Sequence, residues 1–529
     1  MAACFAFLYR GSGEIAEATW LVEGNVMDVV HALWQGLMVA TTPENLVWAL
    51  AGCVLGTALG VLPGFGPSVA VALLLPMTLH VDITQAFIFF IAVACGGTYG
   101  GSTASILINV PGESSSAVTA MEGNRMALNG RAGVALAAAA MGSLIAGILA
   151  ALLVVWVAPQ VAGVVSRWGP AEVFMLMVMA LGAVSAAVGK STLRGVTALW
   201  VGLALACVGT DPAHGVERWT AGLPGLYDGV EMVLVAMGLF VVAEVLHAAM
   251  YEGQTRRTLN TVGRVRLTGL DWRRSWRPWL RGTAVGAPLG CVPVGGIDMP
   301  AYVSYAAERY MVRDQYRSEF GREGAIEGIA GPEAANSARV TAALIPLLVM
   351  GIPTSNTTAV MLSAFQNYGV VPGPQWLASG HLFVWVLIAS LLIGHVMLWV
   401  LNMPMVRMWT TLLRIPRPQL YAGMLVLATA GVYGMRQSVG DLCLLYGMGL
   451  LGVGMRRFDF PLTPLVVGLV LGPLMEVQLR QAIAVGHGSW AIFVQQPVSL
   501  TLLVVVAALV VVPRVLRSWA QRRMAQTRD

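Results

Sequence analysis

Long apolar runs separated by short polar stretches dominate the chain. The runs are continuous and rich in Leu, Val, Ala and Met, without the alternation of barrel strands, so they predict helices. A hydrocarbon core of roughly 30 Å takes about 20 apolar residues per helix, and the chain therefore has room for about 12 crossings. We predict apolar segments at 46–76, 84–109, 134–158, 171–189, 195–209, 229–250, 279–303, 326–350, 355–371, 380–403, 418–434, 439–454, 461–475 and 497–513.

Composition supports the bilayer as the solvent of this chain. Hydrophobic residues make up 57% of it, charged residues 11%, and the mean hydropathy is +0.72, unlike a soluble domain. The net charge of +5 comes mainly from arginines between the apolar runs. The positive-inside rule accounts for arginines at such positions, so the charge does not indicate nucleic-acid binding. The six cysteines are scattered singly, with neither disulfide nor zinc spacing.

Charge also predicts the orientation of the chain. Residues 251–281 form one long polar loop rich in arginine, and residues 514–529 form a basic tail, so we expect both in the cytoplasm. Residues 1–26 lack the apolar core of a cleavable signal peptide. Because Met27 is a second plausible start, this extension is predicted to be dispensable or mis-assigned.

Two glycine and proline patterns occur twice, in the same order. The first pattern is Gly52, Gly56, Gly60 and Pro63, and it recurs with the same spacing at Gly282, Gly286, Gly290 and Pro293. The second pattern is Val110-Pro111 followed by serines at 115–116, and it resembles Ile352-Pro353 followed by threonines at 357–358. The first copy follows acidic or neutral residues and the second follows the arginine-rich loop, so the two copies are expected to enter the membrane from opposite sides. Such inverted repeats are typical of secondary transporters.

The predicted fold is therefore an all-α polytopic membrane protein with re-entrant or broken helices in two inverted repeats. The predicted segments are 1–26 as the extension, 27–250 as the first repeat, 251–281 as the loop, 282–403 as the core of the second repeat, 404–513 as C-terminal helices and 514–529 as the tail.

Polar clusters interrupt the apolar runs of the first copy at 63–68, 96–103 and 109–116. Proline and glycine break the helical ladder, and backbone freed at membrane depth survives only where protein or a wet cavity satisfies it. Its amides, helix ends and hydroxyls can then hold a carboxylate and a cation. The ladder of Gly52, Gly56 and Gly60 favours helix packing instead.

The second copy offers similar groups at 331–337 and 351–358, whose carbonyl, hydroxyl and amide groups suit sodium and a carboxylate. Arg339 stands at the start of an apolar run, where it either binds a carboxylate or pairs with an acid such as Glu333. The candidate substrate or ion ligands of both copies are Pro63, Gly64, Gly66, Gly97, Thr98, Gly100, Ser102, Asn109, Pro111, Gly112, Glu113, Ser114, Ser115, Ser116, Glu333, Asn336, Arg339, Gly351, Pro353, Thr354, Ser355, Asn356, Thr357 and Thr358.

The sequence gives no support for an enzyme. Gly189-Lys190-Ser191-Thr192 resembles the end of a phosphate-binding loop, but Val184 stands where its first glycine should be. The histidines lack the H-E-x-x-H spacing, and no G-x-S-x-G elbow is present. A transport-inactive scaffold or channel and an intramembrane enzyme stay as the alternatives to a carrier.

The chain resembles the TctA family, the large membrane subunit of tripartite tricarboxylate transporters, from about Met27 to Ile483. The resemblance is carried, in order, by Leu62-Pro63-Gly64-Phe65-Gly66-Pro67, Gly97-Thr98-Tyr99-Gly100-Gly101-Ser102, Asn109-Val110-Pro111-Gly112, Gly324-Ala325-Ile326-Glu327-Gly328, Pro332-Glu333-Ala334-Ala335-Asn336, Gly351-Ile352-Pro353, Phe460-Pro461-Leu462 and Gly472-Pro473. Two positions depart from the family pattern: the turn Pro293-Val294-Gly295-Gly296, and Arg339, where the family tends to have a small residue.

The resemblance implies a multi-pass protein of the bacterial inner membrane that imports a small organic carboxylate. Its expected partners are a periplasmic solute-binding protein and a small four-helix membrane subunit. No cofactor is expected, and an ion gradient is expected to drive uptake. Because the candidate sites offer mostly neutral oxygens, sodium is the expected coupling ion. Glu113 and Glu333 could instead carry protons, so proton coupling is the alternative.

Overall fold

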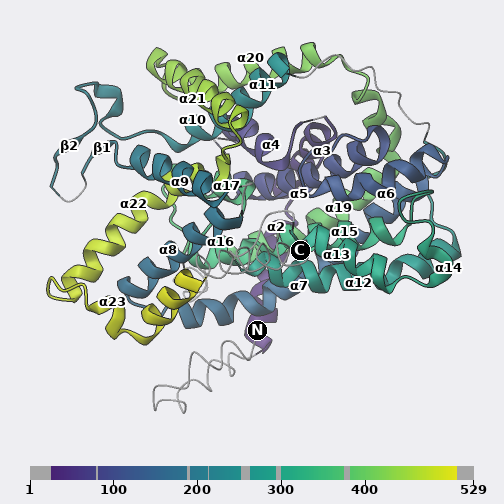
Figure 1. Cartoon of the computed structure of the whole chain (residues 1–529), viewed down its shortest axis with the longest axis horizontal. Coiled ribbons are helices and arrows are strands. Elements are labelled where there is room, and N and C mark those ends of the chain that lie inside the picture. The colour runs from purple at the N-terminus through teal and green to yellow at the C-terminus, as the bar shows by residue number, and fades with distance from the viewer. Residues whose placement is uncertain are drawn as a thin grey trace, which may run out of the picture.

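The computed structural model describes residues 26–62, 64–78, 81–187, 191–211, 214–251, 262–292, 299–373 and 382–508 (Figure 1). The predicted extension and the basic tail, except for Val26, lie outside this part of the chain, as does the turn Pro293-Val294-Gly295-Gly296. Nearly all of the described chain is helical, which confirms the all-α polytopic class.

The helices follow the apolar runs closely. The first half contains α2 (Val26–Ala40), α3 (Pro43–Val61), α4 (Pro67–Leu74), η2 (Leu75–Thr78), α5 (Ile83–Ile108), α6 (Ser116–Leu128), α7 (Ala132–Val165), α8 (Pro170–Ala187), α9 (Thr192–Ala206), the strands β1 (Gly209–Thr210) and β2 (Glu217–Arg218), η3 (Pro224–Leu226), α10 (Met232–Ala236), the π-helical η4 (Met237–Val242) and α11 (Ala243–Tyr251). The second half contains α12 (Gly269–Cys291), α13 (Met299–Met311), α14 (Asp314–Arg317), α15 (Glu327–Ala342), α16 (Leu344–Met350), α17 (Asn356–Asn367), α19 (Leu382–Leu412), α20 (Arg417–Arg436), α21 (Val439–Arg457), α22 (Leu462–Val485) and α23 (Ile492–Gln495).

Within the described residues, seven helical segments are long and apolar enough to cross a membrane. Five shorter apolar helices accompany them. One of the shorter ones, the α4–η2 unit Pro67–Thr78, adjoins the polar cluster at 63–68. Short and interrupted helices of this kind are tolerated in a membrane where neighbouring protein covers them.

The two glycine ladders pack helices in the same way in both copies. α3 lies against α5, and α12 lies against α15. A Cβ on Gly56 would come within 2.5 Å of the Val93 carbonyl oxygen, and a Cβ on Gly290 within 2.5 Å of the Arg339 carbonyl oxygen. Only glycine permits so close an approach of two helix backbones, which confirms the packing interpretation of the ladder.

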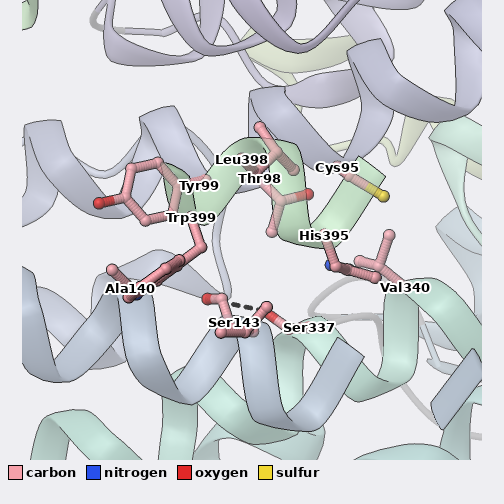
Figure 2. A pocket seen from close by; sticks show the side chains of 11 residues that line it. Cys95, Thr98, Tyr99, Ala140, Ser143, Ser337, Val340, His395, Leu398 and Trp399 are labelled. Atoms are coloured by element: carbon pink, nitrogen blue, oxygen red, sulfur yellow. Dashed lines mark hydrogen bonds between the residues drawn. The ribbon is translucent and has the colours of Figure 1, made fainter. Parts of the chain in front are cut away.

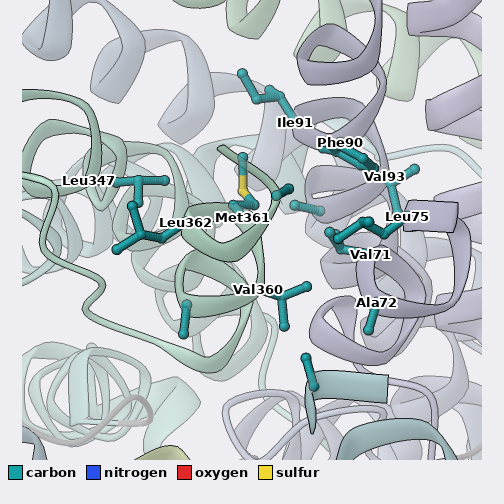
Figure 3. Close-up of a cluster of buried hydrophobic side chains, with 14 of the residues drawn as sticks. Val71, Ala72, Leu75, Phe90, Ile91, Val93, Leu347, Val360, Met361 and Leu362 are labelled. Carbon is teal, nitrogen blue, oxygen red and sulfur yellow. The ribbon is translucent and has the colours of Figure 1, made fainter. Parts of the chain in front are cut away.

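Short helices of each copy pack against short helices of the other copy. α17 of the second copy packs against α4 of the first, and α13 of the second packs against α6 of the first. Figure 3 shows the apolar core where α4 and α5 of the first copy meet α16 and α17 of the second; Phe90, Val360 and Leu362 lie there, almost fully buried. The two copies therefore share one core.

α3 and α12 start at opposite ends of α5. Gln85, at the start of α5, donates to Glu44 at the start of α3 (3.1 Å). At the other end of α5, Asn124 donates to the Ile106 carbonyl (3.1 Å), and α6 leads to Arg131, which pairs with Asp271 at the start of α12 (2.7 Å). This arrangement supports the inverted repeat, whose placement in a bilayer stays a prediction.

The predicted interruption at 96–103 is wrong. α5 runs without a break through 96–103, and α15 runs without a break through 331–337. In α5 the glycines serve the approach of α3, since a Cβ on Gly100 would come within 2.5 Å of the Thr57 carbonyl oxygen. In α15 the proline at 332 lies inside the helix, in its second turn, where it removes one ladder bond while the helix continues to Ala342.

The polar loop is also shorter than predicted. Helix α12 begins at Gly269 instead of near residue 279, so residues 269–281 are helical. The Thr268 hydroxyl accepts from the Asp271 amide, and the Asp271 carboxylate accepts from the Thr268 amide. This capping box starts the helix within a sequence that is polar overall.

Candidate functional site

Each copy has a helix break at the same place in its pattern. α5 ends at Ile108 and is followed by Asn109 with a φ of 54°, and α16 ends at Met350 and is followed by Gly351 with a φ of 66°. Pro111 and Pro353 come two residues later and prevent the helix from continuing. At Gly351 a side chain is also blocked, because a Cβ would lie 2.9 Å from the Pro372 carbonyl oxygen.

A cavity of about 220 Å³ lies between the two breaks. Both copies supply its walls, and α11, α21 and α22 close it. Of the predicted ligands, Gly64, Gly66, Gly112, Glu113, Ser114, Arg339, Ser355, Asn356 and Thr357 line it. Residues from widely separated parts of the sequence therefore meet at one place.

Direct hydrogen bonds join the two copies beside this cavity. The Asn336 amide donates to Glu113 Oε1 (2.9 Å), and the Ser115 hydroxyl donates to the same oxygen (2.6 Å). Arg339 is 6% exposed and donates to Asn336 Oδ1 (3.3 Å). The guanidinium of Arg339 is thus held within the cavity wall instead of reaching out to a helix end.

A second arginine in the wall was not predicted. Arg456, at the end of α21, pairs with Glu244 of α11, and both side chains line the cavity. Positive-inside reasoning assigns an arginine at a helix end to the membrane surface, so nothing in the local sequence distinguishes Arg456. Only the packing of α21 against α11 brings it to the site.

Three buried polar atoms near the cavity make no hydrogen bond within the described part of the chain. They are Asn356 Oδ1, Thr354 Oγ1 and Arg456 Nε. Leaving a buried polar atom without a partner costs about 1–3 kcal/mol. Asn356 and Arg456 line the cavity itself, so a polar ligand there would satisfy atoms that the protein leaves unbonded.

Glu333 lies in a second polar cluster. Its carboxylate is 1% exposed and accepts from the hydroxyls of Ser102 (2.7 Å), Thr119 (2.9 Å) and Ser143 (3.3 Å). These hydroxyls come from α5, α6 and α7. Ser102 was predicted, whereas Thr119, in the polar helix α6, and Ser143, in the apolar helix α7, were not.

A small cavity of about 20 Å³ adjoins this cluster, with room for about one water-sized particle (Figure 2). Thr98, Ser143 and Ser337 line it, and Ser337 donates to Ser143 (2.9 Å). His395 of α19 also lines it and is hydrogen-bonded to Thr341 (2.9 Å). A further cavity of similar size shares Cys95 with this one and Arg339 with the large cavity, so the three form a row.

The remaining predicted ligands do not line the large cavity, and most of them have structural roles. Gly97 and Gly100 lie within the α3–α5 contact, Asn109 and Pro111 are exposed at the first break, and Pro353 is buried at the second. The Ser116 hydroxyl donates to the Glu113 carbonyl (2.8 Å), and Thr358 accepts from the Thr354 and Ser355 amides (3.0 and 2.8 Å). Pro63 lies outside the described residues.

A helical membrane protein with two interlocked repeats, whose helix breaks meet at a polar cavity, has the architecture of a membrane carrier. The chain belongs to the tripartite tricarboxylate transporter TctA family, whose model matches residues 46–467. This confirms the predicted family.

Two relatives come from Agrobacterium vitis, and both are described as uncharacterized. The 52.8 kDa protein in the TAR-I ttuC' 3' region is 40% identical over 487 residues, which cover 92% of this chain and 96% of that protein. A protein in the TAR-II ttuC' 3' region is 37% identical over 218 residues, which cover 41% of this chain and 89% of that protein. No solved structure matches the chain.

Proposed function

We propose that this chain is the large permease subunit of a tripartite secondary transporter that imports small organic carboxylates across the bacterial inner membrane. A periplasmic binding protein delivers the substrate, a small four-helix membrane subunit assists, and a sodium gradient drives uptake. Membership of the TctA family supports the transporter class and the tripartite organisation.

The observation that carries the proposal is the cavity between the two helix breaks. It brings Arg339 and Arg456 into one wall, together with the amide of Asn356. Arginine offers a planar fork of donors that matches a carboxylate. A substrate carboxylate bound there would take hydrogen bonds that Arg456 Nε does not make within the described chain.

Glu333 is the proposed site of the coupling ion. Its carboxylate and the hydroxyls of Ser102, Thr119 and Ser143 provide negative charge and neutral oxygens together, and hard cations such as sodium prefer oxygen ligands. Asn336, one helical turn after Glu333 on α15, is hydrogen-bonded to Glu113 beside the large cavity. A single helix therefore links the proposed ion site to the proposed substrate site.

Uptake in proteoliposomes tests this function. The chain is reconstituted with the small subunit, and a binding protein loaded with labelled carboxylate is added outside. We expect uptake with an inward sodium gradient, and none when only a pH gradient is imposed or when either partner is left out. Uptake that follows the pH gradient would replace sodium by protons, and uptake without any gradient or partner would overturn the proposal, as would the absence of uptake in every condition.

A further inference from the structure

The segment between α9 and α10 forms a compact projection at one end of the molecule. Strands β1 and β2 pair antiparallel, with Gly209 opposite Arg218 and Thr210 opposite Glu217. Figure 1 shows this hairpin and α14 at opposite ends of the longest axis. The hairpin therefore lies at the end of the molecule away from α14 and the start of α12.

Ion pairs hold the projection against α22. Arg218 pairs with Glu476 (2.9 Å), and Arg480 pairs with both Glu476 (2.6 Å) and Asp211 (3.0 Å). The Tyr227 carbonyl accepts from the amide of Thr210 (2.9 Å) and from its hydroxyl (3.0 Å). A network of several charges fixes geometry better than isolated surface pairs do, so the hairpin is a braced element.

Large apolar side chains project from this braced element. Trp219 is 83% exposed, Val216 60% and Leu223 57%. Trp219 also has a φ of 57°, a backbone conformation that bulky residues rarely adopt. We call Val216, Trp219 and Leu223 the hairpin patch. Exposed aromatic anchors of this kind are enriched among the residues that dominate protein interfaces.

A cavity of about 580 Å³ lies beside the hairpin. Asp211, Arg218, Asp228 and Arg480 give it polar walls, and Leu469 and Pro473 of α22 give it an apolar floor. An apolar centre with a polar rim is the usual anatomy of a protein interface.

Charge places this end of the molecule on the outer side of the membrane. The spanning segment Met232–Met250 follows the hairpin and leads into the arginine-rich residues 251–281, which the positive-inside rule assigns to the cytoplasm. Residues 207–231 themselves carry four acidic residues and one arginine. Asp211 and Glu231 pair with Arg480 and Arg436, whereas Glu217 and Asp228 are exposed. These two exposed acids favour a partner with basic residues.

We propose that the hairpin patch and the adjoining cavity are the docking surface for the soluble carboxylate-binding protein, with Trp219 as its anchor. The inference rests on the proposed function, which supplies such a partner on the outer side. The partner is expected to offer an apolar pocket for Trp219, surrounded by lysine or arginine that faces the exposed Glu217 and Asp228.

Site-specific photocrosslinking tests the docking directly, without requiring transport. A benzophenone amino acid replaces Trp219 in one variant of the reconstituted complex and Tyr310 in another. Tyr310 is 80% exposed and lies on α13, which leads to α14 at the opposite end, so it is a matched control. We expect an adduct with the loaded binding protein from position 219 and none from position 310.

Other adducts decide against the proposal. An adduct of position 219 with lipid alone would assign Trp219 to the aromatic belt of the interface, and an adduct with a second copy of the chain would make the patch a self-association surface. Equal adducts from both positions would show that the contact is non-specific. Each of these results overturns the docking surface, whether or not the vesicles transport carboxylate.

Affinity provides a second measurement. Truncating an interface anchor commonly costs at least 2 kcal/mol, so Trp219→Ala should raise the binding-protein concentration for half-maximal uptake by at least about 30-fold while the rate at saturation stays unchanged. If Trp219→Ala reaches the membrane poorly, the exposed Asp228→Lys is used instead, and it should weaken docking and reduce its salt dependence. Unchanged half-maximal concentrations in both variants would contradict the proposal.

Discussion

Asn336 of the second repeat donates to Glu113 of the first at 2.9 Å, across a separation of 223 residues in the sequence. The Glu113 carboxylate lines the cavity between the helix breaks, and Asn336 also accepts from Arg339. One short hydrogen-bonded chain therefore connects an acid of one repeat to an arginine of the other. Anything that binds Arg339 in the cavity acts on both repeats at once.

Removing the charge of Arg456 should weaken substrate binding. A hydrogen bond to a charged group contributes about 1.5–3 kcal/mol, so Arg456→Gln is expected to raise the KM for carboxylate uptake by about 10-fold or more. The neighbouring Arg457 is exposed and does not line the cavity, so Arg457→Gln is the matched control and should leave KM unchanged. Equal effects of the two substitutions would remove Arg456 from the site.

Asn356→Ala should lower transport without lowering the amount of protein in the membrane. Its Oδ1 atom has no hydrogen-bond partner in the described part of the chain, so the folded protein loses no bond to that atom when the side chain is truncated. Asn367, exposed at the other end of α17, provides the control substitution Asn367→Ala. Initial uptake rates and quantitative membrane blots check the prediction, and full uptake by Asn356→Ala would reject it.

Glu333→Gln should separate ion coupling from substrate binding. The amide keeps the shape of the carboxylate and can still accept from the surrounding hydroxyls, but it carries no charge to hold a cation. We expect sodium-driven uptake to be lost while labelled carboxylate still binds the purified protein with at most a few-fold change in Kd. Glu323→Gln, at an exposed position, is the control. Sodium-driven uptake at the normal rate in Glu333→Gln would place the ion site elsewhere.

Gly100→Ala should destabilise the protein through the α3–α5 contact. The added methyl group would come within 2.5 Å of the Thr57 carbonyl oxygen and the Val61 amide nitrogen, and overpacking of this kind typically costs about 1–3 kcal/mol. A methyl group added at Gly447 of α21 would meet no atom within 4 Å among the described residues, so Gly447→Ala should not lower stability. Thermal unfolding in detergent compares the two variants, and equal melting temperatures would contradict the packing role of Gly100.

Hydropathy was sufficient to locate most helices, because an apolar run of the right length has few alternatives in a bilayer. The repeat was also visible, since glycine spacing records where two helix backbones touch. The same spacing was ambiguous at 96–103. There a run of glycines and hydroxyls predicted a broken helix, but the close partner α3 makes the helical form of α5 the one that packs.

The site was predictable in outline and not in its electrostatics. Glu113, Ser114 and Asn356 were marked by proline and glycine in the neighbouring sequence, Arg339 was marked by its place at the start of an apolar run, and the four meet at the cavity. Arg456 was not marked, because it lies in the last turn of an apolar helix, where charged residues are ordinary. Glu244 was missed although it stands inside the apolar segment 229–250, where an acid is a signal. Their pairing depends on how α11 and α21 pack, and no local pattern records that contact.

The shared walls of the cavity also limit how the chain can be divided. A cut within residues 252–261 would leave Glu113 on one fragment and Arg339, Asn356 and Arg456 on the other. Each fragment would hold half of the core and part of the site, so neither could act as a small independent carrier. The two repeats thus behave as obligate partners within one polypeptide, and the site forms only when both are folded together.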